Sequence, residues 1–547
     1  TAVIAPKIDP SIPIPKRPKE KTDRDFIEQV LRTFPSKREA QSYINRFKIS
    51  LSPAENEHHQ QNIPGQEQSE QESTKSSIQQ KSQFVDSLFT SRFEHVALIK
   101  IQGPLPALDI KSVAKTLVYL QKLGLMSIVV LDNDEWKEML KEGPSRFNEL
   151  RRWMVDNAAS ISDAIENVGG RAVPIYNGVF TLTNGSEKED KKPYRHRFPK
   201  RILLTDVGAR VNVSLCLLKS CLRLGQIPLI LPIALDGLSM QRVISPNTGI
   251  VELSRALSDQ SNANLLELKT PQIEPMKIIV INSEGGIPSE ERRGSHVFIN
   301  IQQEYEDIIR SFKLNPQWKF THPTSLENFE MIKTCLEKLP STTSAIMVPA
   351  FSPAGLISNL ITDKPLFSSS LPLEASSTHS TSTTVLRYGA PVFFHDSLDT
   401  VNISSLKYLI EKSFERKLNF DKYLSRVKDC INKIIVVGDF QGAAVVTMEK
   451  VEADEKGIPY LDKFSVAPNA QGTGTADILW KQLKIMHPNL MWRSRVDNGV
   501  NKWYFERSDG YFRVPGTNWI MFWCGMEGIY RLKSYIEVVQ SIPPSFF

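Results

Sequence analysis

The sequence has few cysteines, and their positions argue against two classes of protein. The five thiols show neither a paired framework nor the close spacing of zinc ligands; they are Cys216, Cys221, Cys335, Cys430 and Cys524. A disulfide-stapled secreted domain and a zinc module are therefore both disfavoured. We expect reduced structural thiols of an intracellular compartment, and no metal site.

Long apolar runs and a strong charge imbalance are also absent. No stretch approaches the ~18 apolar residues of a transmembrane helix, and the run at residues 227–235 is short and contains Pro228 and Pro232. Lys and Arg number 67 and Asp and Glu number 61, so the net charge is +6 on 547 residues. The sequence therefore predicts neither a membrane nor a nucleic acid as partner.

The character of the sequence changes along the chain. Residues 26–48 have helical periodicity, whereas residues 50–83 are dominated by Gln, Glu, Ser and Asn. The second composition cannot bury a core, so residues 1–92 are predicted to be a leader with short helices and a Gln/Ser-rich linker. From residue 93 onward apolar strands alternate with amphipathic helices, which predicts an α/β domain with a mainly parallel sheet and flanking helices.

A second domain is predicted after a boundary near residue 398, which gives domains at 93–398 and 399–547. The segment 384–394 is still strand-like, and residues 403–415 are amphipathic and helical. Alternating apolar residues at 433–437 and 443–448, joined by a glycine-containing turn, predict a hairpin. A third strand is expected at residues 460–466, so the sheet of this domain is predicted to be mixed.

A glycine-rich turn follows that third strand and precedes a helix predicted at residues 477–486. Gly472 and Gly474 permit close backbone approach, and the amides at a helix start form a site suited to a pyrophosphate. No Lys-Ser/Thr pair follows the glycines, which argues against a nucleotide-triphosphate loop. An ordinary tight turn is the alternative interpretation.

Basic residues lie on the strands on either side of this helix. Arg493 and Arg495 are two residues apart on a strand and should share one face, where two guanidinium groups could clamp a carboxylate. Lys463 is expected to point to the opposite face from Asp462 and Phe464. A pair of surface arginines bonded to neighbouring carboxylates is the alternative.

These motifs belong to one dense match over residues 460–525, which reads YLDKFSV…QGTGTA…LMWRSRVDNGVNKWYFERSDGYF…NWIMFWCG. The match resembles the acetyltransferase domain of N-acetylglutamate synthase, one of the GCN5-related acetyltransferases. In the fungal and vertebrate-type members this domain follows an amino-acid-kinase-like domain. The resemblance implies transfer of an acetyl group from acetyl-CoA, as co-substrate, to the amine of L-glutamate, the first step of arginine biosynthesis.

The resemblance also implies a role for each matching residue. Tyr504 would protonate the departing CoA thiolate. Lys463 and Arg495 would contact the carboxylates of L-glutamate with support from Arg493, and Asn498 would bind its α-amino and α-carboxylate end. The residues that would hold acetyl-CoA are Phe464, Ser465, Val466, Gln471, Gly472, Thr473, Gly474, Thr475 and Ala476. No Cys or Ser nucleophile with a partner His occurs in this region, so direct transfer without an acetyl-enzyme is expected.

Residues 93–398 resemble the fold of N-acetylglutamate kinase more weakly. Kinases of that family open with Lys-x-Gly-Gly, whereas this chain has Gln102 in place of one glycine after Lys100, which puts ATP binding in doubt. In this group the kinase-like domain resembles an L-arginine sensor. Gly389 falls where related sensors bind arginine, although the local sequence departs from their usual Gly-x-Gly-Thr ending. A scaffold that binds no ligand is the alternative.

Further expectations come from the resemblance alone: a mitochondrial matrix location, a homotetramer, feedback inhibition by L-arginine and a complex with acetylglutamate kinase. Three other functions stay open: a protein-amine acetyltransferase, a non-catalytic regulatory or scaffold subunit of an arginine-pathway enzyme complex, and an active acetylglutamate kinase. A protein-amine acetyltransferase would need an acidic groove for a basic peptide, and Lys463, Arg493 and Arg495 have the opposite charge.

The sensor hypothesis makes a testable prediction. A ligand that binds the native state raises its stability, so L-arginine at millimolar concentration should raise the melting temperature in a thermal-shift titration. No stabilisation at that concentration would contradict the sensor role and favour the scaffold.

Overall fold

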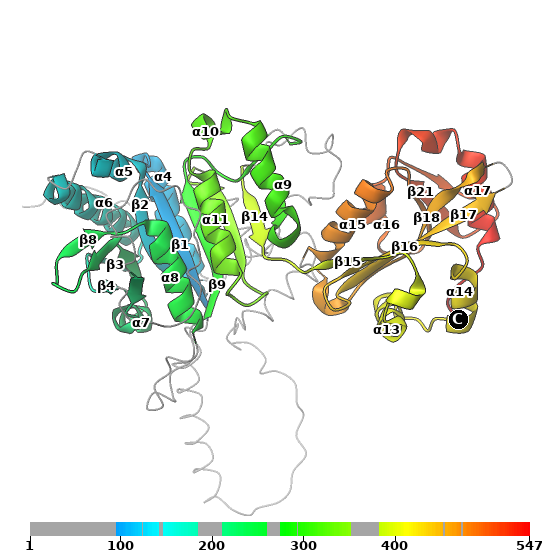
Figure 1. The fold of residues 1–547 in the computed structure, drawn as a ribbon, viewed down its shortest axis with the longest axis horizontal. Helices are drawn as coiled ribbons and strands as arrows, with labels where there is room; N and C mark the ends of the chain where they lie inside the picture. Colours follow the sequence, from blue (N-terminus) through cyan, green and yellow to red (C-terminus); the bar gives the residue numbers. More distant parts are fainter. Residues whose placement is uncertain are drawn as a thin grey trace, which may run out of the picture. The chain divides into compact units, whose positions relative to one another are not determined.

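The computed structural model describes residues 95–547, except residues 123 and 293 and the segments 142–145, 184–209, 260–273, 352–381, 452–453 and 472–473. The predicted leader and linker at residues 1–92 lie outside the described residues. Over the described part of the chain, no helix combines the length and apolar character that a membrane crossing requires. The described residues form two large sheets with their helices (Figure 1).

The first sheet has eight strands in the order β12-β14-β13-β9-β1-β2-β6-β3. Neighbouring strands are parallel, except that β13 and β14 are antiparallel. The mainly parallel sheet predicted from the sequence is therefore confirmed. Its strands are β1 (His95–Gly103), β2 (Met126–Asn133), β3 (Ala172–Ile175), β6 (Ile227–Ile230), β9 (Glu274–Asn282), β12 (Phe298–Asn300), β13 (Ser344–Pro349) and β14 (Thr384–Arg387).

Helices cover both faces of this sheet because its strands are apolar on both sides. Along β1, Val96 and Leu98 pack into one buried cluster, whereas Ala97 and Ile99 pack into another. The first cluster includes side chains of α7 (Cys216–Arg223), α8 (Pro246–Ser258), α9 (Ile301–Leu314) and α11 (Ser325–Leu336). The second includes side chains of α4 (Ala107–Lys122), α5 (Asp134–Lys141) and α6 (Phe147–Asn167).

The apolar run at residues 227–235 is divided in the structure. β6 ends at Ile230, and β7 (Ile233–Leu235) belongs to a separate sheet of order β5-β4-β7-β8. Pro232 lies at the break and has no N–H to donate to a ladder, which explains the change of direction. The other strands of the small sheet are β4 (Phe180–Thr183), β5 (Arg210–Val213) and β8 (Gln241–Val243). Three short elements complete this part of the chain: β10 (Pro288–Ser289), β11 (Gly294–Ser295) and α10 (Trp318–Thr321).

The second large sheet has seven strands in the order β15-β16-β17-β18-β19-β21-β20. Its strands are antiparallel except for β18 and β19, so the predicted mixed sheet is confirmed. The predicted hairpin is the pair of β16 and β17. The strands are β15 (Val392–His395), β16 (Ile431–Val437), β17 (Gly442–Val451), β18 (Asp454–Val466), β19 (Met491–Arg495), β20 (Gly510–Arg513) and β21 (Trp519–Trp523).

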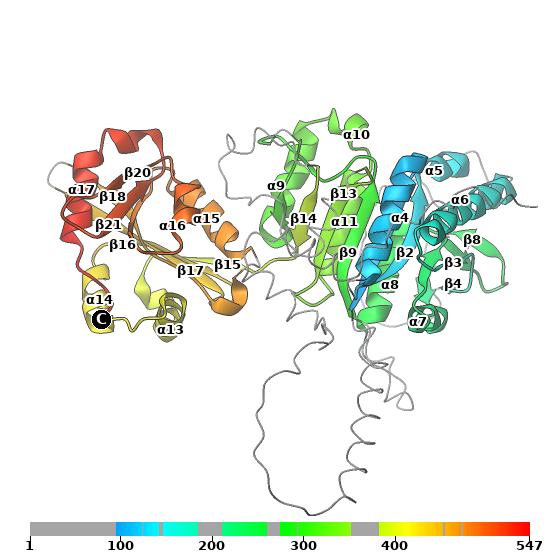
Figure 2. The same cartoon turned by 180° about the vertical axis from the view of Figure 1, so that it is seen from behind.

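Two sets of helices cover opposite faces of the second sheet, as the two views show (Figures 1 and 2). On β16, Ile435 packs into the cluster that includes α15 (Thr475–Met486), together with residues of α16 (Asn501–Phe505). The adjacent Ile434 packs with α13 (Ile403–Phe414) and α14 (Phe420–Val427). A further cluster, which includes Met491, packs against α17 (Leu532–Ser541). Three short 3-10 helices complete the elements: Leu398–Thr400, Pro468–Ala470 and Met526–Ile529.

The strand-like segment at residues 384–394 is also divided. β14 is part of the first sheet, whereas β15 pairs with β16 in the second, so the change of sheet falls between residues 387 and 392. The division of the chain into domains at residue 398 stays a prediction.

Candidate functional site

β18 and β19 run side by side in parallel but pair at one position only. Tyr460 lies opposite Met491, and no further pair is formed between the described residues of these two strands. The other edge of β18 stays paired with β17 as far as Val466. Beyond Tyr460, this edge of β18 is therefore not paired with β19, and its backbone groups there could pair with a ligand. The amide of Val466 is one exception, because it donates to Ser413 Oγ at 3.2 Å.

A β-bulge at Asp462 interrupts the alternation of side chains on β18. Lys463 pairs with Val445 and Leu461 pairs with Val446, so Asp462 is an additional residue on its strand. The prediction that Lys463 points away from Asp462 is wrong, because the bulge places both on one side, with Lys463 Nζ 2.7 Å from Asp462 Oδ2. Phe464 packs on the opposite side, in the cluster of α15.

Lys463 is a buried cation surrounded by acceptors and rings. Its side chain is 6% exposed, and Nζ donates to the Asp462 carbonyl and to Ser545 Oγ, both at 3.2 Å, as well as to the Asp462 carboxylate. The rings of Tyr423 and Phe546 lie 4.7 and 5.6 Å from it. Burial lowers the pKa of the Lys463 ammonium, while the Asp462 carboxylate opposes that shift.

Asp462 fixes this lysine and is itself fixed by Arg426 of α14. Arg426 forms ion pairs with Asp462 and with Glu449, the latter at 3.0 Å. Burial alone would raise the pKa of Asp462, but the charges of Lys463 and Arg426 outweigh it and hold the pKa below its ordinary value. The Asp462 carboxylate is therefore ionised at neutral pH.

The two arginines of β19 share a face as predicted but differ in their contacts. Arg493 donates to the carbonyl oxygens of Val539 and Pro543 and stacks over the ring of Trp519 at 4.2 Å. Arg495 is 43% exposed and pairs with Asp497, Nε to Oδ1, at 3.1 Å. Arg493 therefore holds the last turn of α17 and the chain that follows it, whereas Arg495 has further donors for a ligand.

One cavity of about 690 Å³ brings together the residues predicted to bind the acceptor. All four of them line it: Lys463, Arg493, Arg495 and Asn498. The sequence interpretation missed other lining residues, among them Arg416, Asp462, Ser545 and Phe546. Asp462 could have been found as an acid beside the predicted lysine, whereas nothing in the local pattern around Ser545 indicates a site.

Tyr504 lies on α16, at the opposite face of the second sheet from Lys463. Its half-buried ring packs against Trp492, Trp503 and Phe522, with ring centroids 5.6 Å away in each case. Burial raises the pKa of its hydroxyl to about 12. Tyr504 does not line the cavity of the four acceptor residues.

The glycine-rich turn leads into α15, which begins at Thr475, two residues before its predicted start. Gly474 precedes the helix with φ of 91°, a conformation that favours glycine. Gly472 and Thr473 lie outside the described residues. Gly442 on β17 allows the helix start to lie close to the sheet, because a Cβ there would be 2.7 Å from Thr475 Cγ2. The positive end of the α15 dipole thus lies beside β17.

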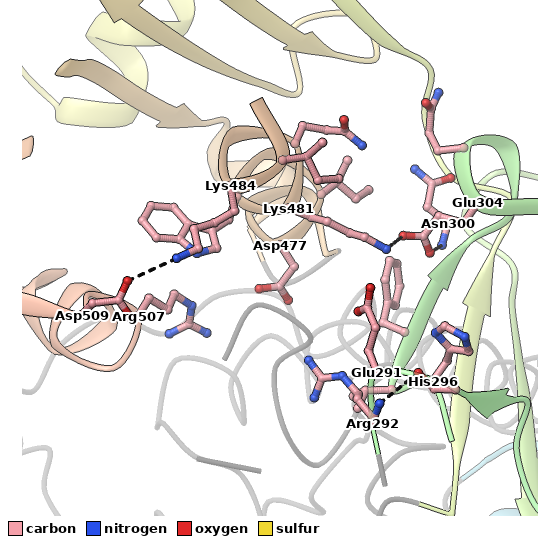
Figure 3. Close-up of a pocket in the computed structure, with 18 residues that line it drawn as sticks. Glu291, Arg292, His296, Asn300, Glu304, Asp477, Lys481, Lys484, Arg507 and Asp509 are labelled. Carbon is pink, nitrogen blue, oxygen red and sulfur yellow. Dashed lines mark hydrogen bonds and ion pairs between the residues drawn. The ribbon is translucent and has the colours of Figure 1, made fainter. Parts of the chain in front are cut away.

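An ion pair joins α15 to the loop that follows α16. Figure 3 shows Lys484 on α15 pointing toward Asp509, with Lys484 Nζ 3.5 Å from Asp509 Oδ2. Arg507, also labelled there, stacks over the ring of Trp503 at 4.1 Å. The ring of Trp503 on α16 also contacts Trp480 on α15, with centroids 5.1 Å apart, so α15 is linked both to α16 and to the loop after it.

Comparisons with known proteins agree with this geometry. A family model described as the N-acetyltransferase of N-acetylglutamate synthase matches residues 393–542. A mitochondrial amino-acid acetyltransferase of Laccaria bicolor is 35% identical, over 84% of this chain and 87% of that protein. The protein of the same name from Coprinopsis cinerea is 33% identical, over 93% of this chain and 86% of that protein. The chain belongs to the family of mitochondrial amino-acid acetyltransferases.

A solved structure is similar at a lower level. N-acetylglutamate synthase from Neisseria gonorrhoeae, complexed with coenzyme A and N-acetyl-glutamate, matches 81% of this chain and 99% of that chain. The identity is 12% and the TM-score 0.47.

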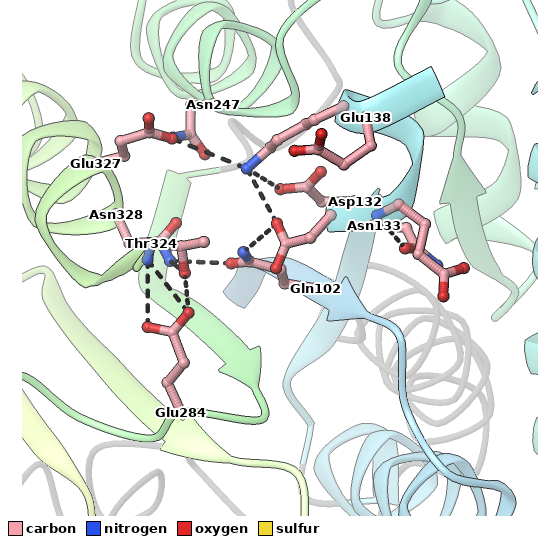
Figure 4. Close-up of polar contacts among 12 residues, drawn as sticks. Gln102, Asp132, Asn133, Glu138, Asn247, Glu284, Thr324, Glu327 and Asn328 are labelled. Carbon is pink, nitrogen blue, oxygen red and sulfur yellow. Dashed lines mark hydrogen bonds and ion pairs between the residues drawn. The ribbon is translucent and has the colours of Figure 1, made fainter. Parts of the chain in front are cut away.

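The first sheet of this acetyltransferase contains a buried polar network around Lys100. Figure 4 shows Asp132, Asn247 and Asn328 converging from β2, α8 and α11. Lys100 Nζ lies 2.7 Å from Asn247 Oδ1, 2.8 Å from Asn328 Oδ1 and 2.8 Å from Asp132 Oδ2. These three acceptors match the three ammonium hydrogens, so none is left for a phosphate.

Gln102 and Glu284 extend the network (Figure 4). Gln102 donates to Asp134 Oδ1 and accepts from Asn328 Nδ2, both at 3.0 Å. Glu284 accepts from the Thr324 hydroxyl at 2.8 Å, at the N-terminus of α11, where a bound anion would otherwise lie. Asp132 therefore occupies the Lys100 ammonium, and Glu284 occupies the N-terminus of α11. These are the two groups of the network most suited to a triphosphate, so their pairing argues against ATP binding.

Gly389 lies after β14 with φ of 89° and faces Asn300 at the end of β12. A Cβ at Gly389 would lie 1.8 Å from Asn300 Oδ1, so a side chain there would displace Asn300. Asn300 is 2% exposed, and neither polar atom of its amide has a hydrogen-bond partner among the described residues. The role of Gly389 in arginine binding stays a prediction.

The Lys100 network predicts a large loss of stability when its cation is removed. Lys100→Met leaves the Asp132 carboxylate buried without its nearest counter-charge, which should cost about 3–5 kcal/mol. The midpoint of the first transition in urea unfolding measures the loss, since a chain of several domains does not unfold in two states.

The control for this experiment is Lys137→Met. Lys137 is 28% exposed and lies 3.8 Å from Asp132, so its loss should cost no more than about 1 kcal/mol. The double variant Lys100→Met/Asp132→Leu should recover part of the stability, because it removes both charges. An effect of Lys100→Met no larger than that of Lys137→Met would contradict the role given to this network.

Proposed function

We propose that this chain transfers the acetyl group of acetyl-CoA to the amine of L-glutamate, giving N-acetyl-L-glutamate and CoA. The observation that carries this proposal is the cavity in which Lys463, Arg493, Arg495 and Asn498 meet beside the open edge of β18. Three cations suit an acceptor with two carboxylates. The family model for the N-acetyltransferase of N-acetylglutamate synthase covers the same part of the chain.

Acetyl-CoA is proposed to bind along the open edge of β18 and at the start of α15. The backbone at Phe464, Ser465 and Val466 would bind the pantetheine arm, since extended ligands can pair with an open strand edge. The helix N-terminus would hold the pyrophosphate. The residues proposed for that end are Gln471, Gly472, Thr473, Gly474, Thr475 and Ala476.

The acceptor is proposed to bind in the cavity on the other face. Arg495 is proposed to contact a carboxylate directly, because it is partly exposed and pairs, among the described residues, with the exposed Asp497. Lys463 supplies a second positive charge whose position Asp462 fixes. Arg493 shapes the cavity through the backbone carbonyls that it binds.

The reaction is proposed to be a direct transfer. The glutamate nitrogen attacks the thioester carbonyl, the C–N bond forms, and the C–S bond breaks. The proton that the amine loses balances the proton that the thiolate gains. Holding both substrates in line lowers the barrier by several kcal/mol. No cofactor is proposed to be bound permanently.

Tyr504 is proposed to face the departing thiolate. A phenol with a pKa of about 12 keeps its proton at neutral pH and can donate a hydrogen bond. Complete proton transfer to a thiolate whose thiol has a pKa of about 8.5 would cost about 5 kcal/mol. Stabilisation of the negative charge by the hydrogen bond is therefore the larger part of its role as an acid.

Regulation, assembly and location are the remaining parts of the proposal. The relatives' names place them in mitochondria, and we propose the mitochondrial matrix for this chain. The buried amide of Asn300, which lies beside Gly389 and has no hydrogen-bond partner among the described residues, supports a ligand site there, for which L-arginine is the proposed effector. A homotetramer and a complex with acetylglutamate kinase follow only from the resemblance.

The first test measures thiol release from acetyl-CoA with L-glutamate, L-aspartate or a basic peptide as acceptor. Tyr504→Phe should lower kcat about 100-fold, the lower end of the range for a lost acid–base group, without changing KM for L-glutamate. Tyr511→Phe is the matched control, because Tyr511 is 60% exposed on β20 and should tolerate the change. Because the pKa of Tyr504 is about 12, its deprotonation should not reduce activity between pH 7 and 10.

Two outcomes would contradict the proposed function. No release with any acceptor would favour a non-catalytic regulatory subunit. Release with the basic peptide alone would mean that the chain is a protein-amine acetyltransferase.

A second test should distinguish the roles of the two arginines of β19. Arg495→Ala should raise KM for L-glutamate about 10–100-fold, the cost of a lost charged hydrogen bond, and leave the melting temperature unchanged. Arg493→Ala should lower the melting temperature, because two carbonyl contacts and the stacking on Trp519 are lost. Equal effects of both variants on KM and stability would contradict this division of roles.

A further inference from the structure

The segment 542–547 forms one wall of the acceptor cavity. It follows α17, and residues lining the cavity from this segment are Ile542, Pro544, Ser545, Phe546 and Phe547. Lys463 on β18 is 82 residues away from Ser545 in sequence, yet the two side chains are in contact. The sequence motifs that indicate acetyl transfer end at residue 525, so this wall lies outside them.

Backbone hydrogen bonds fix the position of this segment. The amide of Asn419 donates to the Ser545 carbonyl at 3.0 Å, and the amide of Phe547 donates to the Lys417 carbonyl at 3.2 Å. Phe546 also forms an isolated antiparallel bridge with Leu418, and its ring lies 5.0 Å from that of Phe414. The Ser545 side chain is therefore held in place by its backbone, not by its own contacts.

Ser545 Oγ is the most easily displaced of the three acceptors around Lys463. The Asp462 carboxylate is ionised and lies 2.7 Å from Nζ, and the Asp462 carbonyl lies on the same strand as Lys463 itself. The Ser545 hydroxyl is neutral and lies 3.2 Å away. It accepts from Lys463 and keeps its own O–H as a donor.

We propose that Ser545 and Lys463 together bind a carboxylate of the acceptor amino acid. The carboxylate enters between the two side chains. It replaces Ser545 Oγ as the acceptor of the hydrogen bond from the Lys463 ammonium, and it accepts a second hydrogen bond from the Ser545 hydroxyl. One hydrogen bond is exchanged for two, and neither side chain is left without a partner. This inference rests on the proposed function, because it requires an acceptor with a carboxylate in this cavity.

A neutral donor beside Lys463 has a consequence for the choice of substrate. Lys463 alone would attract any anion, whereas a fixed hydroxyl adds a requirement for an oxygen acceptor at a defined place. A site built around a hydrogen bond discriminates strongly against ligands that cannot make it. Ser545 is thus inferred to contribute to the binding of the acceptor and not to the chemical step.

The test is steady-state kinetics of Ser545→Ala in the full chain, with L-glutamate and acetyl-CoA varied in turn. KM for L-glutamate should rise about tenfold, the effect of one hydrogen bond to a charged group, while kcat and KM for acetyl-CoA stay within about twofold. Ser545→Thr keeps the hydroxyl and should stay near the wild-type KM.

Ser541→Ala is the matched control. Ser541 lies at the end of α17, its hydroxyl donates to the Val538 carbonyl at 3.1 Å, and it does not line the cavity. All its kinetic constants should equal those of the wild type. Any loss of structure common to serine substitutions at this end of the chain would appear in this variant too.

Three outcomes would overturn the inference. An unchanged KM for L-glutamate in Ser545→Ala would remove the hydroxyl from the site. Equal changes in both KM values together with a lower melting temperature, in Ala and Thr variants alike, would mean that Ser545 only packs. Absence of glutamate-dependent thiol release by the wild type would instead refute the proposed function, and this inference with it.

Discussion

The parting of β18 and β19 is the constraint on which the arrangement of the second sheet depends. The strands share one pair, Tyr460 with Met491, and then separate, so backbone groups of β18 lose the ladder that parallel strands normally provide. The start of α15 lies at one face of this opening and the cavity with Lys463 at the other. The acetyl donor on one face and the acceptor amino acid on the other can therefore approach each other through the opening in the sheet.

Burial of a positive charge is the second constraint, and it acts in both large sheets. Lys463 and Lys100 are almost fully buried, and each has its ammonium surrounded by acceptors. A buried ion is costly unless it is paired and hydrogen-bonded, so each lysine is fixed by an aspartate. The difference lies in access: Lys463 lines a cavity, whereas the acceptors around Lys100 account for all of its hydrogens.

The two arginines of β19 occupy similar positions in the sequence but make different contacts. Both lie on the same face of one strand, yet Arg493 donates to one carbonyl in α17 and one after it, whereas Arg495 pairs with one exposed aspartate. The segment 542–547, which accepts a hydrogen bond from Arg493 through Pro543, also brings Ser545 to Lys463. The segment after α17 therefore helps to decide which donors stay open to an acceptor.

The sequence by itself determined the elements that depend on local patterns: the mainly parallel first sheet, the hairpin of β16 and β17, and the helix after the glycine-rich turn. Its apolar periodicity and its glycines suffice for these because they act over a few residues. Only the tertiary structure decided the bulge at Asp462, the separation of β18 from β19 and the place of Ser545. Each of these depends on pairing between residues far apart in the chain, which no local pattern records.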